Sequence, residues 1–229
     1  MPKHLHKLLF YTSILIASYS LCLLLFFFPH QTKILLRIQA TSLFSLSSYL
    51  VLILHNKHLP TIKQQKNIHI FHIILFIVYV SQLCHLLFFA SEFSRDQVNL
   101  QDSYFYALSQ QWQYNTNLQP FYTIRSMISI IPYSDYYQEI AFLNIFGNII
   151  AFAPFSYFLP NLFPIMRKTK YFIWTMTLII CSVEILQFLT LTGSMDVDDF
   201  ILNMLGSLIT YTIYMHITKK NNRLKKALL

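Results

Sequence analysis

The residues best suited to chemistry lie between Glu184 and Gly206. Glu184 and Gln187 stand inside an apolar run, three aspartates follow in a short turn, and Asn203 lies in the next apolar run. Four of the nine acidic residues of the chain fall in this stretch. A carboxylate in an apolar segment costs at least a few kcal/mol unless it is paired or hydrated, so Glu184 predicts a functional site.

Three polar pairs have a spacing that places both members on one face of a helix. They are Asn144 with Asn148, Glu184 with Gln187, and Asp199 with Asn203. Carboxamide groups can donate hydrogen bonds to a carboxylate, so we expect the pairs to converge on Glu184. The predicted pocket is lined by Asn144, Asn148, Glu184, Gln187, Asp196, Asp198, Asp199 and Asn203.

The aspartates allow two interpretations. One of Asp198 and Asp199 is expected to cap the helix that follows, because a carboxylate accepts from free backbone N–H groups and complements the helix dipole. Three aspartates in four residues exceed what a cap needs. The alternative is a site for a divalent cation or a cationic ligand, with Asp196, Asp198 and Asp199 as its candidate ligands.

The composition is that of a membrane protein with several spans. The 229 residues are 55% hydrophobic and only 11% charged, whereas a soluble domain has about 25% charged residues. The mean hydropathy is +0.47. In such a protein the net charge of +8 is explained by cytoplasmic loops, and no nucleic-acid partner is needed; the partner is the lipid bilayer.

The apolar runs predict an all-α bundle of about six transmembrane helices. The expected spans are 8–28, 34–54, 68–90, 141–163, 171–191 and 200–217. The fourth should kink or break at Pro154 and Pro160. Gly206 and Gly147 are expected to permit close helix packing.

Three domains are predicted: an N-terminal extension of two spans with a polar linker, a membrane domain, and a basic cytoplasmic tail. Their ranges are 1–67, with the linker from residue 55, then 68–218 and 219–229. The apolar stretch 120–132 is too short to cross about 30 Å of hydrocarbon, so it is expected to be an interfacial or re-entrant segment.

The basic residues predict the orientation. Six spans place both termini on one side, and 13 of the 17 Lys and Arg residues fall on that side. The positive-inside rule therefore assigns both termini to the cytoplasm and the polar pocket to the outer face of the cell membrane.

Three blocks of the sequence resemble the VanZ-like family. They are N-L-Q-P-F-Y-T-I from Asn117, N-I-F-G-N-I-I-A-F-A-P-F-S-Y-F-L-P from Asn144, and E-x-x-Q from Glu184 with the aspartates, Asn203 and Gly206 after it. Two positions depart from the family pattern. Ser156 stands where the family often has Gly, and Thr192 to Ser194 fill a turn where it often has an Arg.

The resemblance implies a bacterial cell-membrane protein, because the founding member is linked to resistance to the glycopeptide teicoplanin. We therefore expect an envelope protein that binds or modifies a cell-wall-related ligand, a cell-wall precursor or a glycopeptide. The first alternative is an intramembrane enzyme acting on a lipid-linked or peptidoglycan precursor, with Glu184 as general base and Asp199 as the best candidate for a metal ligand or general acid. A transporter of small solutes or lipids, or a polar set that only locks helices together, remain further alternatives.

Overall fold

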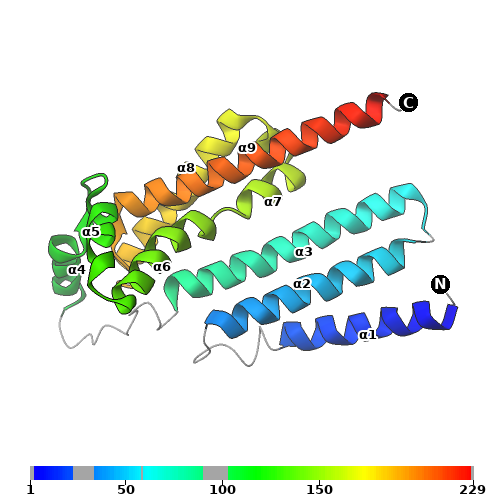
Figure 1. Cartoon of the computed structure of the whole chain (residues 1–229), viewed down its shortest axis with the longest axis horizontal. Helices are drawn as coiled ribbons and strands as arrows, with labels where there is room; N and C mark the ends of the chain where they lie inside the picture. The colour runs from blue at the N-terminus through cyan, green and yellow to red at the C-terminus, as the bar shows by residue number, and fades with distance from the viewer. Residues whose placement is uncertain (1–2, 23–33, 58, 90–102, 228–229) are drawn as a thin grey trace. The chain divides into compact units, whose positions relative to one another are not determined.

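The described part of the chain is almost entirely helical (Figure 1). The computed structural model describes residues 3–22, 34–57, 59–89 and 103–227. Among these residues, five helices are long and apolar enough to cross a membrane, and a shorter apolar stretch, Leu9–Leu21, lies in the first helix. The expected all-α polytopic fold is therefore confirmed. The chain divides into two compact units, Met1–Arg95 and Asp96–Leu229.

The described residues of the first unit form three helices: α1 (Lys3–Cys22), α2 (Ile34–Asn56) and α3 (Thr61–Phe88). The middle helix packs against both of the others, and its buried Ala40 and Phe44 form the centre of the unit. The Arg37 side chain of α2 donates from Nε to Gln82 Oε1 of α3 at 3.1 Å.

Two expectations for this unit need comment. The linker expected over residues 55–67 is largely helical, because α2 ends at Asn56 and α3 begins at Thr61. Lys63 and Lys66 lie within the first two turns of α3. Hydropathy identifies only the apolar part of a helix, so it does not reveal that the polar residues from Thr61 belong to the same helix. Residues 23–28 of the first expected span lie outside the described residues.

The second unit holds six α-helices, two short 3-10 helices and two short strands among its described residues. In chain order they are α4 (Tyr104–Tyr114), β1 (Thr116–Asn117), α5 (Tyr122–Ile130), η3 (Ile131–Tyr133), α6 (Asp135–Ala151), α7 (Phe155–Leu162), η4 (Pro164–Arg167), α8 (Thr169–Leu189), β2 (Met195–Asp196) and α9 (Val197–Ala227). The helices α4 and α5 lie at the end of this unit where α9 begins (Figure 1). Polar sequence hid α4 from prediction, and residues 120–132 form α5 and part of η3.

Proline interrupts the expected fourth span once. The helix α6 ends at Ala151 and α7 begins at Phe155, directly after Pro154. Pro160 does not end α7, which continues to Leu162, so the expected break at this second proline is wrong. Because proline has no backbone N–H, α7 lacks the intrahelical bond from residue 160 to the carbonyl of Ser156.

The segment α6–α7 runs parallel to α9 at close range. A Cβ atom added at Gly206 of α9 would collide with the backbone carbonyl of Ile149 in α6, so the expected close packing at Gly206 is confirmed. Further along, the buried Ser156 donates to the carbonyl oxygen of Ser207 at 2.7 Å. The same expectation for Gly147 is wrong, because nothing lies within 4 Å of a Cβ at that position.

Candidate functional site

A two-stranded parallel pairing brings two distant parts of the second unit together. In β1 and β2, Thr116 pairs with Met195 and Asn117 with Asp196. The Asp196 carboxylate accepts from the Asn117 side-chain amide at 2.9 Å and from the Thr123 hydroxyl. Its Oδ1 also accepts from the backbone N–H of Asp198 at 2.8 Å. With these three donors, the buried Asp196 joins β1 and α5 to the start of α9.

Asp196 is also the residue that caps α9. This helix begins at Val197, so Asp196 precedes it directly and satisfies a free N–H of its first turn. The expectation that Asp198 or Asp199 is the cap is therefore wrong. The helix begins three residues before the apolar run on which the prediction relied, and these two aspartates lie within its first turn.

Asp198 is fully buried and fastens the beginning of α5. Its two carboxylate oxygens accept from the backbone N–H groups of Phe121 and Ile124, the latter at 3.0 Å. Phe121 precedes α5 in the left-handed conformation, with φ of 66°. Such a backbone costs roughly 1–2 kcal/mol for a residue with a side chain, and the bond to Asp198 offsets it.

Glu184 and Gln187 lie at the C-terminal end of α8, where both side chains are buried. Glu184 Oε2 accepts from the backbone N–H of Asp196 at 3.3 Å. The position of Gly193 in the following turn brings its backbone close to the Gln187 side chain, since a Cβ there would lie 3.2 Å from Gln187 Nε2. Glu184 therefore contacts the turn that carries Asp196, and the expected convergence of the three polar pairs on Glu184 stays a prediction.

A second polar group lies between α6 and α9. The Asn148 amide donates to Asp199 Oδ1. Asn144 stands one turn before Asn148 on α6, and Asn203 stands one turn after Asp199 on α9. The side-chain oxygens of Asn144 and Asn203 are both buried and accept no hydrogen bond from the described part of the chain, and Asn203 is only 2% exposed.

These two carboxamide oxygens lie at similar depth. The helices run parallel and touch at Ile149 and Gly206. Asn144 is five residues before Ile149 and Asn203 three residues before Gly206, so they lie about 7.5 and 4.5 Å from that contact along the helices, on the same side. Buried acceptors without donors are rare in proteins and call for an explanation.

Seven of the eight predicted pocket residues thus form two sets, and the eighth, Gln187, lies beside Gly193. Asp196, Asp198 and Glu184 accept from backbone and side-chain donors of β1, α5 and β2. Asn144, Asn148, Asp199 and Asn203 line the contact of α6 with α9. Within the described residues, no group of three or more His, Cys, Asp or Glu side chains is arranged to hold a metal ion.

Sequence reasoning missed the polar residues that α4, β1 and α5 contribute to this site. Asn117 and Thr123 contact Asp196, although 79 and 73 residues separate them in the chain. From α4, Gln111 donates to the Gly193 carbonyl, and Tyr104 donates to the Leu189 carbonyl at 2.7 Å. The block from Asn117 was the one available signal, because its resemblance to the family pattern singled out this segment without saying what its side chains bind.

A family model described as VanZ/LLP1 matches residues 76–219, which is more than half of the chain. Neither the curated proteins nor the solved structures contain a match.

Proposed function

Because the chain belongs to the VanZ/LLP1 family of multi-pass membrane proteins, we propose that it binds a cell-wall-related ligand at the acidic end of its second unit. The ligand would be a cell-wall precursor or a glycopeptide that offers hydrogen-bond donors. The residues that would contact it are Asn144, Asn148, Asp199 and Asn203, together with Glu184 and Gln187. Asp196 and Asp198 would act as positioning residues, because their oxygens already accept from β1 and α5.

One observation carries this proposal. Two buried carboxamide oxygens, on Asn144 and Asn203, have no donor among the residues that the structure describes. Each such group costs roughly 1–3 kcal/mol, which a ligand with N–H or ammonium donors would recover. A polar set that only locked helices together would be expected to satisfy its own acceptors. The neighbouring Asp199 carboxylate adds preference for a positively charged donor.

We also propose that this end faces the outside of the cell and that both termini are cytoplasmic. The six acidic residues described in the second unit lie at the end where α8 finishes and α9 begins. At the opposite end lie the basic residues Arg167, Lys168, Lys170, Lys219 and Lys220. Arg125 on α5 is the described exception. The positive-inside rule places the basic end in the cytoplasm.

The orientation is tested by labelling single cysteines in a chain whose own three cysteines are replaced by serine. A membrane-impermeant maleimide added to intact cells is expected to label Gln113→Cys on α4 and to spare Lys219→Cys near the C-terminal end of α9. Labelling of Lys219→Cys in intact cells would contradict the proposed orientation.

The binding proposal is tested in a bacterial host that is sensitive to teicoplanin. The variants Glu184→Gln and Asp199→Asn keep the shape of each side chain and remove its charge. We expect both to reach the membrane in the amount of the wild type, while the teicoplanin susceptibility of the host returns toward that of cells without the chain. Gly147→Ala, on an open face of α6, is the control that should keep full effect. Normal abundance with unchanged susceptibility would contradict the proposal.

A further inference from the structure

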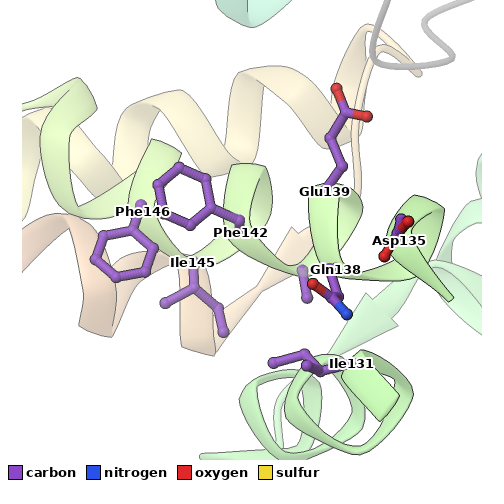
Figure 2. Close-up of a pocket in the computed structure, with 8 residues that line it drawn as sticks. Ile131, Asp135, Gln138, Glu139, Phe142, Ile145 and Phe146 are labelled. Atoms are coloured by element: carbon purple, nitrogen blue, oxygen red, sulfur yellow. The ribbon is translucent and has the colours of Figure 1, made fainter. Parts of the chain in front are cut away.

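A groove of about 500 Å³ opens along α6, apart from the buried polar set (Figure 2). Ile131 of η3 forms part of its wall, and the rest of the lining comes from α6. At one end the lining side chains are polar, with Asp135, Gln138 and Glu139. Phe142, Ile145 and Phe146 continue along α6 from there (Figure 2).

The groove therefore has an acidic end and an apolar end on one helix. Asp135 and Glu139 are four residues apart, so they project from the same face, and both are exposed. The rings of Phe142 and Phe146 stack with centroids 4.5 Å apart and are 58% and 46% exposed. From Asp135 to Phe146 the helix rises by about 16 Å, which is comparable to a lipid head group with the upper part of its acyl chain.

The position in the chain places this groove at a membrane surface. The helix α6 is the first part of the candidate span Asp135–Leu162. Its acidic end is the end of that span, and its aromatic pair lies two to three turns into it. Exposed aromatic and aliphatic side chains at this depth face lipid rather than water.

We propose that the groove binds a membrane lipid whose head group carries a primary ammonium. The ammonium would lie between the carboxylates of Asp135 and Glu139, where both charge and hydrogen bonding are complementary. The acyl chain would lie on Phe142, Ile145 and Phe146. An anionic lipid is disfavoured because the lining contains two carboxylates and no basic residue. A small polar solute would leave the apolar half of the groove uncovered.

The head-group preference is tested with the full chain, purified in detergent and titrated with three phospholipids of identical acyl chains. Native mass spectrometry would count the lipids retained from phosphatidylethanolamine, phosphatidylcholine and phosphatidylglycerol. We expect phosphatidylethanolamine to be retained best, because the choline head group is a cation without N–H donors and the glycerol lipid is anionic. Equal retention of the ethanolamine and choline lipids would overturn the proposal.

A matched pair of variants separates the groove from overall charge. Glu139→Gln and Gln113→Lys each raise the net charge by one, and Gln113 is an exposed residue of α4 outside the groove. We expect Glu139→Gln to weaken the affinity for phosphatidylethanolamine by about threefold, the size of one exposed charge pair, and to leave phosphatidylcholine unchanged. Gln113→Lys should change neither lipid. An equal loss in both variants would overturn the proposal.

The acyl-chain position is tested in membranes. Phosphatidylethanolamine with a photoreactive diazirine on its acyl chain would be incorporated with the full chain into phosphatidylcholine nanodiscs. We expect cross-links on the peptide that contains Phe142 and Phe146. The double variant Asp135→Asn with Glu139→Gln should reduce them. Cross-links confined to other peptides, or coverage of this face by residues 1–95 in a protein cross-linking experiment, would overturn it. Neither result depends on whether teicoplanin or a cell-wall precursor is a ligand of the polar set.

Discussion

Removing the charge of Asp198 should loosen α5 without touching the proposed ligand-binding residues. The Asp198 carboxylate is fully buried and accepts from two backbone N–H groups, those of Phe121 and Ile124. The variant Asp198→Asn keeps one carbonyl oxygen but turns an NH2 group toward the second N–H. One bond is lost, and two donors then face each other.

The size of the effect follows from these two bonds. A hydrogen bond to a charged group contributes about 1.5–3 kcal/mol, and a buried backbone N–H left unsatisfied costs a similar amount. We therefore expect Asp198→Asn to lower the free energy of unfolding of the second unit by about 2–3 kcal/mol. The left-handed Phe121 should relax at the same time, because its N–H no longer holds that conformation.

The assay combines stability with local accessibility. Unfolding of the purified full chain in mixed micelles would be followed by circular dichroism, and limited trypsin digestion would report cleavage after the exposed Arg125 on α5. Faster cleavage at Arg125 and a less stable chain are expected for Asp198→Asn. The control Asp135→Asn removes an exposed carboxylate from α6 and should change stability by less than about 0.5 kcal/mol. Unchanged stability and cleavage in Asp198→Asn would refute the role given to this carboxylate.

Three further predictions concern the contact of α6 and α7 with α9. Gly206→Ala should destabilise the chain by about 2–3 kcal/mol in the same unfolding assay, because its Cβ would meet the Ile149 backbone. The control Gly147→Ala should be neutral or slightly stabilising. Equal effects of the two substitutions would contradict the packing described. Asn148→Leu should lower the free energy of unfolding by about 2 kcal/mol, because Asp199 loses its Asn148 donor. Adding Asp199→Leu should recover most of that stability. Additive losses in this double-mutant cycle would argue against a direct bond. Ser156→Ala should lower the free energy of unfolding by about 1 kcal/mol, because it deletes the buried bond to Ser207. The measurement is the unfolding midpoint, and an unchanged midpoint would show that this bond makes no net contribution to stability.

The membrane-crossing architecture could be predicted because long apolar runs have a single physical interpretation. Hydropathy located the apolar cores of five long helices, and Pro154 marked the break between α6 and α7. It could not locate helix ends, because a helix continues into water as long as its backbone bonds are made. Two helices begin earlier than their apolar runs: α3 begins at Thr61 and α9 at Val197.

The site could be predicted only on the side that lies in apolar sequence. Glu184, Gln187 and Asn203 stand out there because a polar group in hydrocarbon needs a reason. Asn117 and Thr123 lie in polar sequence, where such residues are ordinary, and only the pairing of β1 with β2 reveals their bonds to Asp196. The capping residue could not be predicted either, because it depends on the exact residue at which α9 begins. The helix begins at Val197, which makes Asp196 the cap.

The central claim is that the buried carboxamide oxygens accept hydrogen bonds from a ligand. Its most direct test compares two forms of one probe. A lipid-linked peptidoglycan precursor with a free amine in its peptide, and the same molecule with that amine acetylated, would be titrated into the purified full chain. We predict that the wild type binds the free amine about tenfold more tightly, and that Asn144→Leu with Asn203→Leu removes this preference while the chain remains folded. Equal binding of the two forms by the wild type would contradict the claim.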